Sequence, residues 1–220
     1  MIYATDVAHR IGCCRAWHAE DPDARAVPFA LALNSAAIDR WPSHKSAQYL
    51  DEAATLLMAH ATRAGVTLET ARAVAGVLGN RCQLRIPHSM DPAGDLEDAL
   101  AAGRAAVTFL HDAIHAHAQS QAPSHAARDD LNGLLSVALA YLARAIAEAG
   151  QAADAESRLA EADALVTALG QRGTATASDA REVHEVVEDA KRFVSGAEPV
   201  YEYSLWFGAA RHAVALFPVR

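Results

Sequence analysis

Apolar residues recur along most of this chain at the spacing of one helix face. In the segment 95–119, the large apolar residues follow one another at steps of three, four and seven, which places them on one side of a helix. They are Leu96, Leu100, Val107, Leu110 and Ile114. The sequence therefore predicts a long amphipathic helix over this segment.

Residues that start and end helices divide the rest of the chain into similar segments. Ser, Thr and Asp precede several of the periodic stretches, and Gly65, Gly150 and Gly170 follow three of them, as expected for helix caps. Besides 95–119, the predicted helices span about 5–19, 28–40, 44–64, 67–79, 125–149, 152–169 and a segment beginning at Ser178. The segments 82–86 and 200–206 lack helical spacing and are predicted to be extended, with a short last helix after the second.

Composition supports an all-α fold of about eight or nine helices in antiparallel pairs, arranged as a bundle or short solenoid. Hydrophobic residues make up 52% of the 220 residues and aromatic residues only 6%. Alanine is the commonest residue, and it favours helices because it loses no side-chain entropy there. The loop from Pro87 to Gly94 divides the chain into an N-terminal helical half, 1–86, and a C-terminal half, 87–220, unless the two form one continuous domain.

Charge and cysteine content narrow the possible partners and compartments. The net charge is −8, and no concentrated basic surface is evident, so a nucleic-acid partner is not expected. The chain has three cysteines, an odd number, and two of them are adjacent, which argues against a disulfide framework. They are Cys13, Cys14 and Cys82. We find no signal peptide, and no stretch that approaches the roughly 18 to 20 apolar residues of a membrane span. We therefore expect a cytoplasmic protein without a membrane partner.

Small and large residues recur at fixed offsets between residues 135 and 168. They are Leu139, Leu142, Ala143, Ile146, Gly150, Ala155, Leu159 and Ala162. This spacing resembles the tetratricopeptide repeat, although the first helix has aliphatic residues where aromatic ones are usual and no proline closes the second. The resemblance implies a helical surface that binds a peptide or protein. In this hairpin we expect Leu139, Tyr141 and Ile146 to contact the partner.

The chain from Phe193 to Phe217 is rich in aromatic residues and allows two interpretations. It packs back over the core, or it forms an exposed patch that docks a partner or a second subunit. In the second case the contacting residues are Tyr201, Tyr203, Trp206 and Phe207.

A group of histidines is the strongest candidate for a metal site. His111 and His115 are four residues apart, so on a helix both imidazoles point the same way, and His88 is a candidate third ligand. The sequence Phe109-Leu110-His111-Asp112 also resembles the central motif of HD-domain metal-dependent phosphohydrolases. That resemblance implies His88 as the upstream ligand and Asp130 or Asp189 as the last one. Against it, His88 lies in a proline-flanked stretch, and Asp112 falls opposite the apolar face of its helix.

Cys14 and His18 are also four residues apart, so a thiolate–imidazolium pair is geometrically possible, although a small buried thiol is the simpler interpretation.

Three functions follow, in order of preference. The first is a non-enzymatic protein–protein interaction or scaffold protein with no cofactor. The second is a hydrolase centred on His111 that uses a divalent metal ion. The third is a structural homo-oligomer whose aromatic tail closes the contact between subunits.

Overall fold

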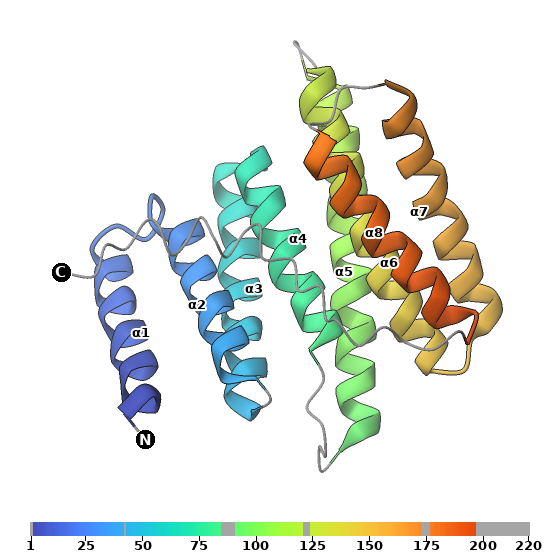
Figure 1. Cartoon of the computed structure of the whole chain (residues 1–220). Helices are drawn as coiled ribbons and strands as arrows, with labels where there is room; N and C mark the ends of the chain where they lie inside the picture. The colour runs from blue at the N-terminus through green and yellow to red at the C-terminus, as the bar shows by residue number, and fades with distance from the viewer. Residues whose placement is uncertain (1, 42, 85–90, 121–123, 173–176, 197–220) are drawn as a thin grey trace. The chain divides into compact units, whose positions relative to one another are not determined.

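The structure is a computed structural model that describes residues 2–41, 43–84, 91–120, 124–172 and 177–196. Every regular element in these ranges is an α-helix, and none of the described residues forms a strand (Figure 1). The prediction of an all-α fold is therefore confirmed. The last segment of the aromatic tail and the ninth helix expected there lie outside the described residues.

The eight described helices belong to two compact units. The first unit holds α1 (Ile2–Glu20), α2 (Ala26–Arg40), α3 (His44–Ala64) and α4 (Leu68–Gln83). The second unit holds α5 (Pro92–Ala118), α6 (His125–Glu148), α7 (Ala152–Arg172) and α8 (Ala177–Val194).

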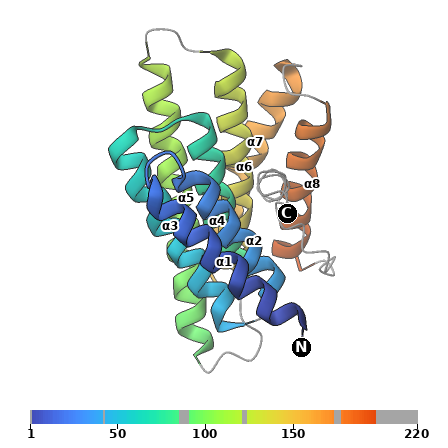
Figure 2. The same ribbon diagram turned by 90° about the vertical axis from the view of Figure 1, so that its left-hand side faces the viewer.

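In the first unit, sequential helices pack against one another. Helix α2 contacts α1, α3 and α4, and α3 also contacts α4 (Figure 2). Leu33, Leu50, Leu57, Val74 and Val77 are almost completely buried, which forms the apolar core of this unit. Gly65 ends α3 at a φ of 85°, a backbone conformation that glycine adopts without steric cost, so the chain reverses into α4.

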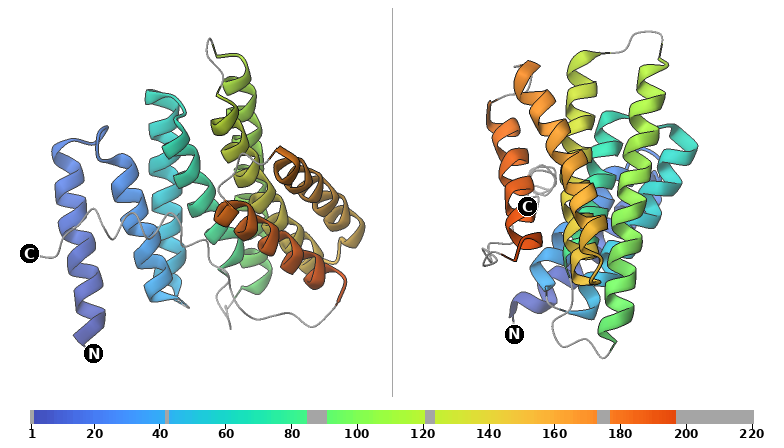
Figure 3. Two further views of the ribbon diagram at one scale, coloured as in Figure 1. Left: turned by 45° about the horizontal axis from the view of Figure 1, so that its top comes forward. Right: turned by 90° about the vertical axis from the view of Figure 1, so that its right-hand side faces the viewer.

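In the second unit, α6 is the central helix. It contacts α5, α7 and α8, and α7 contacts α8 (Figure 3). Every residue from Leu131 to Ala143 is buried, so all sides of this stretch of α6 belong to the interior. Gly150, at a φ of 77°, makes the tight turn by which α7 returns along α6.

Helix α6 also corrects one expectation from the sequence. By length and composition alone, this helix could cross a membrane. However, 83% of its most apolar stretch is buried inside the protein. The core helix of a soluble protein passes the same test, and the burial of α6 is that of a core helix.

Several element boundaries differ from the predicted ones. Helix α1 begins at Ile2, and α5 begins at Pro92, inside the predicted loop, where the side chain of Asp91 caps it by accepting from the amide of Gly94. Cys82 continues α4 instead of starting an extended segment, and it is only 1% exposed, so burial favours one more helical turn. Gly170 lies inside α7, where the cost of a glycine, about 1 kcal/mol, is small beside the burial of the neighbouring Leu169. Ser178 lies inside α8, which begins at Ala177. Residues 85–86 and 200–206 lie outside the described ranges.

Candidate functional site

The pairing of α7 with α8 creates the surface groove that is our candidate site. Helix α8 is strongly amphipathic: Val187 and Ala190 are buried, while Glu182 and Glu185 on the opposite side are exposed. Burial of the apolar side against the unit drives the pairing. Glu182 and Glu185 therefore belong to a solvated face.

An ion pair between Lys191 of α8 and Asp163 of α7 links the two helices at one end of the groove. Nζ of Lys191 lies 2.5 Å from Oδ1 of Asp163 on α7 and 2.8 Å from Oε1 of Glu188 on its own helix. The hydrogen bond to Asp163, followed by that to Glu188, raises the pKa of Lys191 above its usual 10.5. The ammonium group therefore keeps its charge throughout the physiological range and links α7 to α8.

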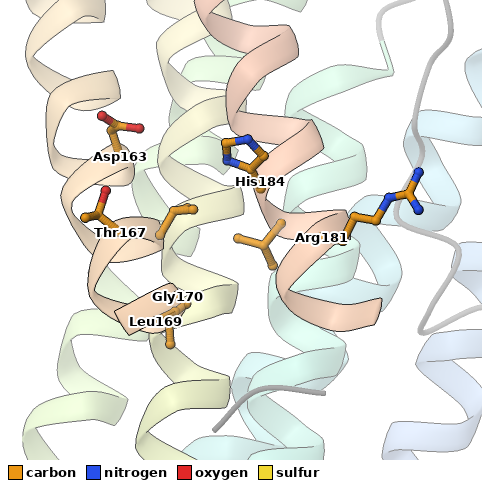
Figure 4. Close-up of a pocket in the computed structure, with 8 residues that line it drawn as sticks. Asp163, Thr167, Leu169, Gly170, Arg181 and His184 are labelled. Atoms are coloured by element: carbon orange, nitrogen blue, oxygen red, sulfur yellow. The ribbon is translucent and has the colours of Figure 1, made fainter. Parts of the chain in front are cut away.

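The groove has a volume of about 430 Å³ and an apolar lining. Val166 and Leu169 of α7 and Val183 of α8 form its apolar lining. The remaining lining residues are Asp163, Thr167, Gly170, Arg181 and His184. Figure 4 shows Asp163 and Thr167 on α7, with His184 and Arg181 on α8. The site therefore combines an apolar floor with a polar, charged rim.

The charged groups at the rim are largely neutralised by neighbours on the same surface. The guanidinium of Arg181 donates a hydrogen bond of 2.8 Å from Nε to Oε1 of Glu185, and Asp163 is paired with Lys191. Exposed pairs of this kind contribute little to stability, because water and salt screen them. These side chains can leave each other and pair with charged groups of a bound protein at a small cost in free energy. The rim is therefore suited to selecting a binding protein rather than to acid–base chemistry.

The histidines of the predicted metal site have separate partners. Nε2 of His111 lies 3.3 Å from Oε1 of Glu161 on α7, and Glu161 also accepts from Arg158 at 3.3 Å. Nε2 of His115 lies 2.8 Å from Nε2 of Gln119. Among the described residues, no three His, Cys, Asp or Glu side chains are grouped so that they could hold a metal ion.

The other residues of the metal hypothesis do not complete this site in the described part of the chain. His88, the expected third ligand, lies outside the described residues. Asp112 is exposed, as the helical spacing predicts for a residue opposite the apolar face. The metal site centred on His111 therefore stays a prediction.

The hairpin residues expected to contact a partner are core residues in this structure. Leu139 is completely buried, and Tyr141 and Ile146 are 2% and 4% exposed. They lie on α6, whose position at the centre of its unit leaves these side chains no accessible face. The spacing detected a close helix pair, because α6 and α7 do pack together, but it could not tell the packed side of the hairpin from an open one. Tyr201, Tyr203, Trp206 and Phe207 lie outside the described residues.

Two polar features of the first unit were not found from the sequence. Asn34 on α2 and Asn80 on α4 are both completely buried and hydrogen bonded to each other. Arg81 is 5% exposed and donates from Nε to Oδ1 of Asp51 at 3.0 Å. Neither pair has a local signature, because the partners are 46 and 30 residues apart.

No family model, no curated protein and no solved structure matches the chain.

Proposed function

We propose that the protein is a non-enzymatic interaction or scaffold protein, and that the α7–α8 groove holds an apolar segment of a protein partner. The observation that carries this proposal is the pair of apolar walls, Val166 with Leu169 and Val183, bordered by charged side chains. An amphipathic helix binds to an apolar groove of this kind by inserting its own apolar residues, which are spaced three or four positions apart. The polar rim would set the orientation of such a segment.

A peptide segment fits this groove better than a small metabolite. The volume of about 430 Å³ lies in the range of ligand pockets, but the groove is only partly enclosed. Its polar groups lie at the rim and do not converge on one point inside it. Small-molecule sites bury most of their ligand and orient it with a few inward polar groups.

The two alternative functions lack support of this kind. The hydrolase hypothesis needs a third ligand beside His111 and His115, and the described residues provide none. The homo-oligomer hypothesis depends on the aromatic tail, which lies outside the described residues. We also propose a reducing, cytoplasmic location, which is compatible with three free thiols at Cys13, Cys14 and Cys82.

The proposal can be tested by cross-linking from the groove. A photoactivatable amino acid at Val183 is used to capture and identify the partner in cells, and binding of the identified partner is then measured with Val183→Arg. We expect this variant to lose binding, because a charged side chain would occupy the apolar floor. Glu182→Arg, on the exposed side of the same helix turn, is the matched control and should bind normally. Equal binding by both variants contradicts the proposal.

A further inference from the structure

Helix α1 lies at the edge of its unit and has two chemically different faces. Its backbone packs beside α2 alone among the described helices (Figure 1), and the side chain of Arg15 reaches Glu52 on α3. Val7 and Ile11 are buried and Cys14 and His18 are half-buried, at steps of four, three and four residues, so these four side chains form the packed face. The opposite face is exposed and carries Ala8, His9, Gly12, Cys13 and Ala16.

Each of the two faces carries one cysteine and one histidine, four residues apart. Cys14 and His18 occupy the packed face, and His9 and Cys13 the exposed one. His18 stacks on Phe29 of α2 with ring centroids 5.0 Å apart. Burial, with a smaller effect of the neighbouring Cys13, raises the pKa of the Cys14 thiol. Cys14 therefore remains a thiol and serves packing.

The exposed pair has the geometry of two ligands of one metal ion. Nε2 of His9 lies 3.7 Å from Sγ of Cys13. In a tetrahedral zinc site with Zn–N of about 2.0 Å and Zn–S of about 2.3 Å, the nitrogen and sulfur are about 3.5 Å apart. The two side chains are thus within a few tenths of an ångström of the separation that zinc imposes, without any change of the helix.

One chain supplies only half of the ligands that a structural zinc ion needs. No third His, Cys, Asp or Glu is grouped with this pair in the part of the chain that the structure describes. Structural zinc sites are almost always four-coordinate. We propose that His9 and Cys13 form half of a zinc site, and that a second copy of the chain contributes its own His9 and Cys13 to complete it.

The exposed face of α1 suits such a contact between two copies. Ala8, Gly12 and Ala16 form a row of small side chains, and a Cβ added at Gly12 would meet no atom within 4 Å. Two α1 helices can therefore approach closely. If they cross antiparallel about a two-fold axis perpendicular to both, both histidine–cysteine pairs lie on the same side of the crossing. If the axis also passes level with residues 9–13, the two pairs lie next to each other and can share one ion.

The charges also balance in this arrangement. Two thiolates neutralise one Zn²⁺, so the completed site carries no net charge. The two arginines of α1 close to this pair in the sequence each have a carboxylate partner. Arg10 lies 3.8 Å from Asp39, and Arg15 makes two contacts of 2.8 Å with the carboxylate of Glu52.

The experiment uses the full chain, freed of metal and kept under a non-thiol reductant so that no disulfide forms. Molecular mass is measured by light scattering as Zn²⁺ is added, and Co²⁺ is used in parallel as a spectroscopic probe. We expect the mass to rise from 23.3 kDa to about twice that value at one zinc ion per two chains. Co²⁺ should give the absorption of a tetrahedral site with thiolate ligands, and a chelator should reverse both changes.

Three variants make the assignment specific. Cys13→Ser and His9→Ala should each abolish the metal-dependent dimer and the thiolate–cobalt absorption, and both replace exposed side chains, so the fold should persist by circular dichroism. Cys14→Ser is the matched control and should keep both signals. One metal ion per monomer, no change of mass with Zn²⁺, or equal loss with Cys14→Ser would each overturn the proposal.

Discussion

The side chains of Asn34 and Asn80 meet inside the core of the first unit, where Nδ2 of Asn80 donates a hydrogen bond of 2.9 Å to Oδ1 of Asn34. Both residues are completely buried, and neither Nδ2 of Asn34 nor Oδ1 of Asn80 has a further partner among the described residues. The pair joins α2 to α4 through one hydrogen bond and leaves polar capacity unused. A buried pair that makes only part of its possible hydrogen bonds contributes little net stability. Replacing one of its two residues is nevertheless costly, because the other is then buried without a hydrogen-bond partner.

We therefore expect a strong difference between single and double substitution of this pair. Asn80→Leu should cost about 1 to 3 kcal/mol in the free energy of unfolding, because the amide of Asn34 remains buried without a partner. The double variant Asn34→Leu, Asn80→Leu should cost clearly less than the sum of the single changes, since it removes both polar groups. Urea unfolding of all four proteins measures the coupling. Simple additivity would show that the hydrogen bond does not link α2 to α4.

Lys191 should make the second unit sensitive to alkaline pH. Its pKa is raised in the folded state, so its stabilising contribution is fully present below 10.5 and is lost as pH rises through the folded pKa. The side chain is 34% exposed, so Lys191→Met should cost only about 0.5 to 1 kcal/mol at neutral pH. The stability difference between wild type and variant should shrink above pH 10.5. A difference that grows in alkaline solution contradicts the assignment.

Gly150 and Gly170 should respond to alanine in opposite directions. Gly150 has a φ of 77°, which costs an alanine about 1 to 2 kcal/mol, so Gly150→Ala should lower the melting temperature. Gly170 lies within α7, and an added Cβ there meets nothing within 4 Å. Gly170→Ala should therefore raise stability by about 0.5 to 1 kcal/mol. Calorimetry of the two variants beside the wild type decides this, and a shift of the same sign in both would refute it.

Leu139 is expected to support the fold rather than a partner contact. It is completely buried in α6, so Leu139→Ala should cost about 2 to 5 kcal/mol by leaving a cavity. Thr108→Ala, on the exposed side of α5 in the same unit, should change stability by less than about 0.5 kcal/mol. Denaturant unfolding compares the two. If Leu139→Ala is harmless to stability but abolishes partner binding, the hairpin surface is the binding site after all.

Metal analysis can separate the two histidine sites. Elemental mass spectrometry is applied to tag-free protein purified without chelators. We expect any bound zinc to disappear with Cys13→Ser and to persist with His111→Ala, because His111 is engaged by Glu161 whereas His9 and Cys13 face each other in solvent. Zinc, iron or manganese that is lost specifically with His111→Ala would instead restore the hydrolase hypothesis and make His115 the next residue to change.

The sequence by itself determined the helices, because helix formation depends on local signals. The predicted range 44–64 is identical to α3. Thr67 and Ser124 accept hydrogen bonds from backbone amides at the starts of α4 and α6. Gly65 and Gly150 follow the ends of their helices at positive φ. Each of these depends on residues within a few positions of one another.

Only the tertiary structure decided which faces are covered and which distant side chains meet. Leu139 and Ile146 satisfy the spacing of a hairpin whether the hairpin is open or enclosed. The packing of α6 against α5, α7 and α8 buries both side chains. Asn34 and Asn80 are separated by 46 residues, so no local pattern links them. The exposure of His9 and Cys13, in contrast to Cys14 and His18, follows from the side of α1 that packs on α2. Periodicity defines the faces of a helix, but its neighbours determine which face solvent reaches.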